Sequence, residues 1–146
     1  MPIVAAVDTS DRSYNVLDQA ATLAERFDET VHVVHVMTRS EAINAETSSI
    51  TSDDAVEINE LRATAANVAA DHLEEHPVSV DTEAVGLIGD PASEIVEYAK
   101  QHNAQYIVVS PRRRSQTGKI LFGSVAQSIL LDTTCPVVSV AEETDK

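Results

Sequence analysis

A segment near the C-terminus combines residue types that can bind an anion. Gly123 and Ser124 open an apolar segment with helical spacing, and Ser110 ends a short apolar run from Tyr106 to Val109. This order is typical of a strand, a loop and a helix. The first N–H groups of a helix lack intrahelical partners and carry the positive end of the helix dipole. The sequence therefore predicts an anion site where the loop meets the helix.

The loop between these two elements concentrates positive charge on an otherwise acidic chain. Its basic residues are four of the ten in the sequence: Arg112, Arg113, Arg114 and Lys119. The planar fork of donors on arginine suits phosphate recognition. Two interpretations stay open: the loop binds an anion, or it is a basic patch that pairs with an acidic protein surface.

The stretch from Ser110 to Val125 resembles the C-terminal signature of the universal stress protein family. In that signature, G-x-x-G, nine further residues and then G-[ST] cradle the phosphates of ATP. Gly123-Ser124 matches the final pair, whereas Ser110 and Arg113 stand where the first two glycines belong. Because a Cβ obstructs close backbone approach, arginine side chains would have to replace the glycine contacts.

The resemblance implies a cofactor and a set of site residues. ATP or another small phosphate ligand is the implied cofactor, and Mg²⁺ is implied only together with ATP. Family members that bind ATP use an aspartate at the end of the first strand near the adenine, and Asp8 matches it. Asp8 equally fits the role of N-cap of the first helix. The implied cofactor-binding residues are Asp8, Ser110, Arg112, Arg113, Gly123, Ser124 and Val125.

The elements that must position these residues alternate between strand and helix. Apolar runs predict strands at residues 3–7, 30–37, 78–85, 105–109 and 136–140, the third with a wetter face typical of a sheet edge. Helical spacing predicts helices at 13–27, 55–76 and 92–102 and a last one from 123 onward. Asp90 as N-cap and Pro91 in the first turn mark the start of the third helix.

This alternation predicts a single α/β domain over residues 1–146, with three layers and a five-stranded, mainly parallel sheet. The resemblance covers essentially the whole chain and implies a Rossmann-like strand order of 3-2-1-4-5. Ligands of open α/β sheets bind where the strand order reverses, so the implied crevice lies between strands 1 and 4. Residues 38–54 are polar without a lasting period, which predicts a surface loop whose position also permits a lid. Gly86 and Gly89 are interpreted as turn residues.

The composition excludes several classes of function. The chain has 24 acidic and 10 basic residues, a net charge of −14 and three lysines. This charge argues against non-specific nucleic-acid binding and against docking on anionic membranes. It resembles the surfaces of halophilic proteins, whose self-repulsion is screened by concentrated salt. A single Cys135 excludes an internal disulfide and no apolar run approaches the ~20 residues of a membrane span, so we expect a cytoplasmic protein.

The sequence contains no arrangement that indicates fast catalysis. His72 and His76 have a spacing that can hold a metal, but no third ligand is evident, so we expect no metal site. No serine has a histidine partner nearby in the sequence, so we expect no catalytic residues. A slow nucleotide hydrolase would need a metal held by carboxylates, for which Asp8 and Asp11 are the visible pair.

These features favour a stress-response protein with a binding or regulatory role. The alternative from another class is a dimeric interaction protein that binds no nucleotide. In the family, the last strand commonly pairs with its counterpart in a second subunit. Pro136–Ala141 is an apolar edge that would otherwise invite uncontrolled pairing, so we expect a homodimer through it.

Overall fold

The centre of the molecule is a five-stranded sheet in which every neighbouring pair is parallel. The computed structural model describes residues 1–45, 54–111, 113–114 and 120–141. The strand order is β3-β2-β1-β4-β7, which confirms the predicted fold class and the predicted edge position of the third strand. The strands are β1 (Ile3–Ala6), β2 (Val31–Met37), β3 (Thr82–Ile88), β4 (Tyr106–Val109) and β7 (Val137–Ser139).

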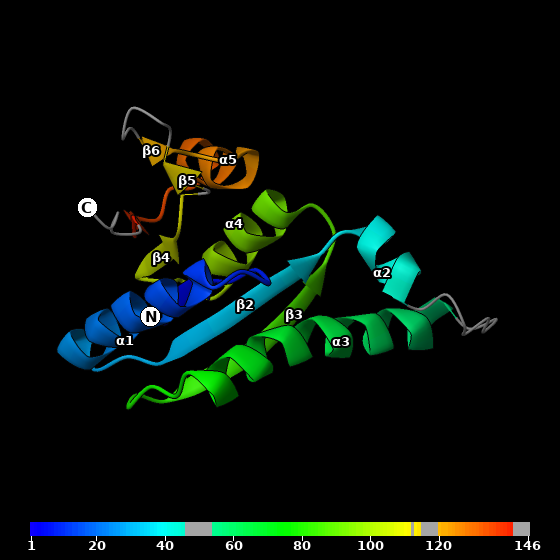
Figure 1. Ribbon diagram of the computed structural model, residues 1–146, viewed down its shortest axis with the longest axis horizontal. Coiled ribbons are helices and arrows are strands. Elements are labelled where there is room, and N and C mark those ends of the chain that lie inside the picture. Colours follow the sequence, from blue (N-terminus) through cyan, green and yellow to red (C-terminus); the bar gives the residue numbers. More distant parts are fainter. Residues whose placement is uncertain (46–53, 112, 115–119, 142–146) are drawn as a thin grey trace.

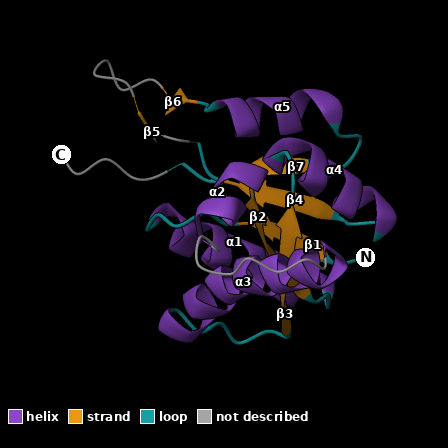
Figure 2. Cartoon of the chain, turned by 90° about the vertical axis from the view of Figure 1, so that its right-hand side faces the viewer, coloured by secondary structure: helices purple, strands orange, loops and turns teal. Residues whose placement is uncertain are grey.

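Helices cover both faces of this sheet (Figures 1 and 2). α1 (Arg12–Phe27) and α3 (Asp54–Glu75) pack on one face, whereas α4 (Pro91–Gln101) and α5 (Ser124–Asp132) pack on the other. α2 (Arg39–Ala45) follows the carboxyl end of β2. Among the helices of the described ranges, none combines the length and apolar character needed to cross a lipid bilayer.

The two faces of the sheet bury separate apolar clusters. Ile3 and Ala5 of β1 point into the cluster under α1 and α3, whereas Val4 between them points into the cluster under α4 and α5. All three side chains are fully buried. This explains why β1 has an unbroken apolar sequence, since both alternating faces of a central parallel strand lie against helices.

Three elements differ from their predicted form. β3 occupies residues 82–88 rather than 78–85, because Val78 and Val80 pack against the α1/α3 cluster ahead of the strand. The predicted loop after β4 contains a two-residue antiparallel pair, β5 (Arg113–Arg114) and β6 (Ile120–Leu121). The predicted surface loop at 38–54 contains α2, and residues 46–53 lie outside the described part of the chain.

The side chain of Thr38 caps the start of α2. The backbone N–H of Glu41 donates to Thr38 Oγ1 at 3.1 Å, and Thr38 Oγ1 donates to Glu41 Oε1 at 3.0 Å. This exchange satisfies an N-terminal amide of a short helix that has little apolar periodicity of its own. Met37 and Ala42 also join Ala65 of α3 in a small buried cluster, so tertiary contact adds to the cap.

Gly86 is required by packing rather than by a turn, so its predicted role was wrong. A Cβ at this position of β3 would lie 2.0 Å from the carbonyl oxygen of Arg62 and 2.3 Å from the nitrogen of Ala66, both backbone atoms of α3. Gly86 therefore allows α3 to lie directly on the strand. Gly89 has a φ of +146°, a conformation that side chains rarely adopt, which agrees with the turn interpretation.

Gly86→Ala should lower the free energy of unfolding by about 3 kcal/mol, because α3 must move as a unit to admit the methyl group. Urea denaturation followed by circular dichroism measures this loss. Thr82→Ala, at an exposed position of the same strand, is the matched control and should stay within ~0.5 kcal/mol of the parent. Equal midpoints for the two variants would contradict the close packing of α3 on β3.

Candidate functional site

A cavity of about 340 Å³ lies at the carboxyl ends of the central strands. β1 and β4 are neighbours in the sheet, and the chain leaves them in opposite directions, toward β2 after β1 and toward β7 after β4. The divergence leaves a space between the start of α1 and the start of α5. This is the position at which open α/β sheets bind ligands.

Five of the seven residues proposed from the sequence line this cavity. They come from the ends of β1 and β4 and from the start of α5: Asp8, Ser110, Gly123, Ser124 and Val125. Arg112 lies outside the described residues. The backbone of Arg113 pairs with Leu121 in the β5–β6 pair, and its side chain lies outside the described part of the chain.

The carboxylate of Asp8 is held by its own loop. Oδ1 accepts from Ser10 N at 2.8 Å, from Ser10 Oγ at 2.6 Å and from Ser13 Oγ at 3.1 Å. The Arg12 guanidinium lies 3.5 Å from Oδ2. Burial by itself would raise the pKa of Asp8, but the bonds from Ser10 and Ser13 and the charge of Arg12 outweigh it and hold the pKa below its ordinary value.

Asp8 is therefore not the N-cap of α1, although one of the two interpretations of the sequence gave it that role. Asp11 occupies the N-cap position of that helix. The Asp8 side chain instead closes a turn onto Ser10, and the hydroxyl of Ser13 bonds the Asp8 main chain as well. These contacts fix the shape of the loop that forms the cavity wall beside β1.

The start of α5 offers backbone donors to the cavity. Gly123 is the N-cap, with φ −69° and ψ 169°, and among the described side chains none caps the helix. Ser124 is the first helical residue rather than the cap, and its side chain is exposed. The first amides of α5 thus remain open to an anionic ligand group.

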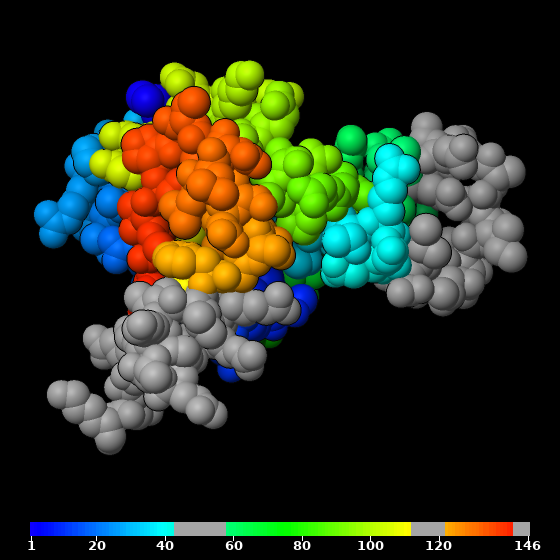
Figure 3. Space-filling view, turned by 90° about the horizontal axis from the view of Figure 1, so that it is seen from above, coloured from blue at the N-terminus to red at the C-terminus, as the bar shows by residue number. Residues whose placement is uncertain are grey.

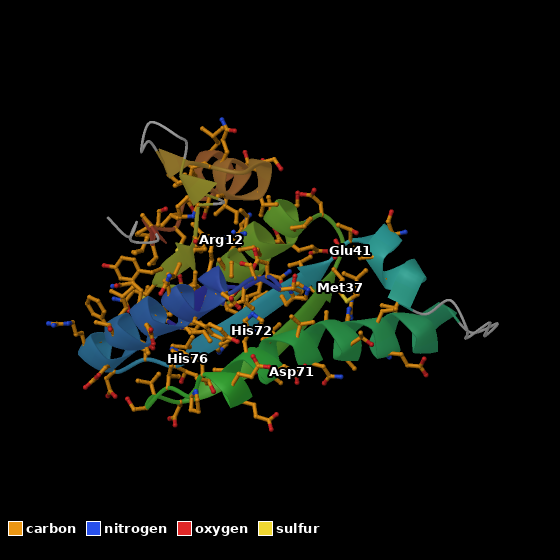
Figure 4. All side chains as sticks on the ribbon, viewed as in Figure 1. Arg12, Met37, Glu41, Asp71, His72 and His76 are labelled. Atoms are coloured by element: carbon orange, nitrogen blue, oxygen red, sulfur yellow. The ribbon has the colours of Figure 1, made fainter. Side chains whose placement is uncertain are left out.

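Sequence reasoning missed five charged or polar residues of the cavity: Thr9, Arg12, Ser13, His35 and Glu41. Figure 4 shows Arg12 at the start of α1 and Glu41 on α2. His35, on β2, is only 6% exposed and its Nδ1 lies 3.0 Å from the carbonyl oxygen of Val7. The available signal was the strand order itself, because the carboxyl end of β2 lies beside that of β1.

His72 of α3 and His76, which directly follows that helix, form a separate arrangement between α3 and α1 (Figure 4). The ring of Tyr14 packs against His72 and His76 with centroid distances of 5.5 and 5.1 Å. His76 Nε2 lies 2.7 Å from the Asp18 carboxylate, while His72 Nε2 is buried without a hydrogen-bond partner. Across the described ranges, no three His, Cys, Asp or Glu side chains are grouped so as to hold a metal ion.

The comparisons with known proteins agree with this geometry. The universal stress protein family model matches residues 1–141. The chain is 30% identical over 138 residues to universal stress protein MJ0531 of Methanocaldococcus jannaschii, covering 94% of this chain and 80% of that protein.

Two solved structures from Archaeoglobus fulgidus share the fold. A universal stress protein is 32% identical with a TM-score of 0.66, covering 96% of this chain and 98% of that one. A universal stress protein in complex with dAMP is 28% identical with a TM-score of 0.61, covering 96% of this chain and 97% of that one.

Asp8→Asn should destabilise the protein only at pH values where the carboxylate is ionised. A pKa lowered by folding means that the carboxylate stabilises the fold above the ordinary value near 4, and that this contribution is lost as the pH falls through the folded pKa. Because the side chain is 59% exposed, we expect a difference of at most ~1 kcal/mol at pH 6–7 that disappears near pH 2.

Denaturation of both proteins across this pH range measures the difference. Ser10→Ala is the matched variant, since it removes one donor to Asp8 and keeps the charge. It should show a smaller loss at neutral pH with the same disappearance in acid. A difference between the parent and Asp8→Asn that persists unchanged at pH 2 would contradict the assignment.

Proposed function

The chain belongs to the universal stress protein family, and on this premise we propose that it binds a nucleotide in the cavity between β1 and β4. The observation that carries the proposal is the position of the α5 N-terminus, which opens on that cavity with Gly123, Ser124 and Val125 in its wall. Phosphate groups bind there through backbone N–H groups and the helix dipole. The relative solved with dAMP supports a nucleotide as the ligand class.

The phosphate contacts differ from those of the glycine-rich signature. Ser110 has a side chain where that signature has glycine, and its hydroxyl donates to the carbonyl of Pro111 at 3.1 Å. Pro111 has no N–H to offer a phosphate. The loop after β4 thus supplies fewer backbone donors, so the amides of α5 carry most of the phosphate binding.

A binding or regulatory role suits this site better than hydrolysis. The pair proposed for a metal, Asp8 and Asp11, is not organised for one: Asp8 already accepts bonds from Ser10 and Ser13 and lies beside Arg12. A metal would have to displace these contacts. Mg²⁺ therefore enters the cavity only as the counter-ion of ATP. The proposed role of the chain in the stress response is to bind the nucleotide and to regulate, not to hydrolyse it.

Gly123→Glu should weaken binding of ATP and AMP by ~100-fold or more, because a carboxylate at the helix start repels the phosphate and fills its position. The backbone at Gly123 suits any residue, so the helix should be kept. Gln127→Glu is the matched control, with the same charge change on an exposed position of the same helix outside the cavity, and it should change affinity less than about threefold.

Isothermal titration calorimetry at high salt measures these affinities, and circular dichroism checks the helix. Equal weakening by both variants would place the phosphate elsewhere. Absence of any heat or thermal shift with the unaltered protein would overturn the nucleotide proposal. The alternative, an interaction protein that binds no nucleotide, would then be favoured.

We further propose that the chain forms a homodimer through the segment Pro136–Ala141. β7 is the last strand of the sheet, so one of its edges is unpaired within the described chain. Beside it on the surface lies α5, seen in orange in Figure 3, on which Leu131 is 76% exposed. A second copy would cover both the strand edge and this apolar side chain.

Ser139→Pro should shift the dimer toward monomers and raise its dissociation constant at least tenfold. The carbonyl oxygen of Pro136 and the N–H of Val140 form hydrogen bonds with β4. Because successive residues of a strand direct their backbone groups to opposite sides, the N–H of Ser139 points to the free edge. Proline at this position removes only that outward donor. Ser139→Thr is the matched control and should leave the dimer intact. Sedimentation in molar salt, which screens the −14 charge of each chain, gives both constants.

An unaltered protein that sediments as a monomer at all concentrations would contradict the dimer. A Ser139→Pro protein that stays dimeric would place the interface outside β7.

A further inference from the structure

A second group of titratable side chains lies at the amino ends of β2 and β3, opposite the cavity. His32 Nδ1 of β2 lies 2.7 Å from the hydroxyl oxygen of Tyr98 on α4, and His32 Nε2 lies 3.3 Å from Glu83 Oε2 on β3. The ring of His102, the C-cap of α4, stacks on Tyr98 with centroids 3.9 Å apart and lies edge-on to His32 at 5.7 Å. Side chains from three elements thus join the C-terminal end of α4 to the sheet.

The neighbours of His32 assign the hydrogen atom of its neutral ring. An ionised carboxylate can only accept, so Nε2 carries the proton and directs it to Glu83. Nδ1 then has the lone pair and accepts from the Tyr98 hydroxyl. Burial, with the charge of Glu83 as the second cause, raises the pKa of Tyr98 to about 12, so this hydroxyl keeps its proton at neutral and acidic pH. The neutral ring of His32 therefore ties α4 to β2.

Protonation of His32 reverses the direction of this hydrogen bond. Both ring nitrogens of an imidazolium are donors, so the Tyr98 oxygen must accept from Nδ1 and turn its own hydrogen away. Tyr98 is 8% exposed, and within the described ranges His32 Nδ1 is the one hydrogen-bond partner of its hydroxyl. The hydroxyl hydrogen would then be buried without an acceptor, which destabilises the contact between α4 and β2.

The surroundings of His32 set the pH range of this change. Burial holds the pKa of His32 below its ordinary value of 6.5, and positive charge on His102 and on the N-terminal ammonium of Met1 acts in the same direction. Glu83 opposes them, but its side chain is 63% exposed, so water screens its charge. A pKa lowered by folding means that neutral His32 stabilises the fold above its ordinary pKa, and that this contribution is lost as the pH falls through the folded pKa.

We propose that His32 and Tyr98 form an acid-sensitive latch, which holds the C-terminal end of α4 on the sheet at neutral pH and releases it when His32 is protonated. The latch does not depend on the proposed nucleotide site, since neither side chain lines the cavity. α4 begins at that cavity, with Pro91 and Ile95 in its wall. A helix that lines the cavity at one end thus carries a pH-sensitive contact at the other.

Hydrogen exchange in molar salt at pH 7.5 and pH 5 tests this latch. Protection factors, which correct for the intrinsic pH dependence of exchange, should fall at least about fivefold at the amides of residues 99–102 in the unaltered protein. The amides of β1 should stay better protected than these at pH 5, because the helix end opens before the whole domain. Asp90 at the other end of α4 does not contribute, since the bond from the Ser93 amide holds its pKa below the ordinary value and keeps it ionised at pH 5.

His32→Asn removes the titrating group and can return an acceptor, Oδ1, near the position of Nδ1. Its protection factors at residues 99–102 should change less than about twofold between the two pH values. Tyr98→Phe keeps the stacked ring without the hydroxyl, so at pH 7.5 its protection should already be about threefold lower than that of the unaltered protein. His76→Asn is the matched control. His76 is a partly buried histidine bonded to Asp18 on the face that α1 and α3 cover, so the fivefold fall should remain.

Ring nitrogen NMR supplies a readout that a packing role would not move. At pH 8 the His32 signals should report a proton on Nε2, and Tyr98→Phe should shift the Nδ1 signal. An unchanged pH dependence in His32→Asn, or amides of α4 and β1 that lose protection together, would overturn the latch. So would a proton on His32 Nδ1 at pH 8, and this measurement on the unaltered protein decides the question if His32→Asn fails to fold.

Discussion

The structure depends on the central position of β1 in a parallel sheet. Ile3 of β1 is in register with Val31 of β2 on one side and with Tyr106 of β4 on the other, so the strand has no free edge. The chain must then leave β1 and β4 toward opposite sides of the sheet. Short right-handed connections cannot fill the space between them, and that space is the cavity.

This constraint also decides which kinds of groups meet in the cavity. The carboxyl ends of β1, β2 and β4 carry loop residues and one buried histidine, whereas α5 begins there and offers amides. The groups that line the cavity are therefore supplied by different parts of the chain.

The departure from the family signature becomes understandable in this geometry. Ser110 and the proline after it reduce the backbone donors of the β4 loop, but the start of α5 does not depend on either residue. The helix N-terminus is produced by Gly123 and the packing of Ala126 and Ile129 on the sheet, both of which are buried. Loss of the signature glycines thus alters one wall of the site and keeps the other.

The amino-acid sequence by itself determined the alternation of strands and helices, the parallel sheet and the beginnings of most helices. These features depend on interactions within about ten residues: apolar periodicity, the Asp90–Pro91 start of α4 and the glycine before α5. The resemblance to the family signature also led to Asp8, Ser110, Gly123, Ser124 and Val125, which line the cavity at strand ends and at the start of α5.

Only the tertiary structure decided the rest. The positions of His35 and Glu41 in the cavity, the packing role of Gly86 and the register of β3 depend on which distant segments lie side by side. A pattern that repeats along one strand reports which face is buried, but not which helix covers that face or what lies beside the end of the strand. Those contacts come from long-range packing, which local periodicity does not encode.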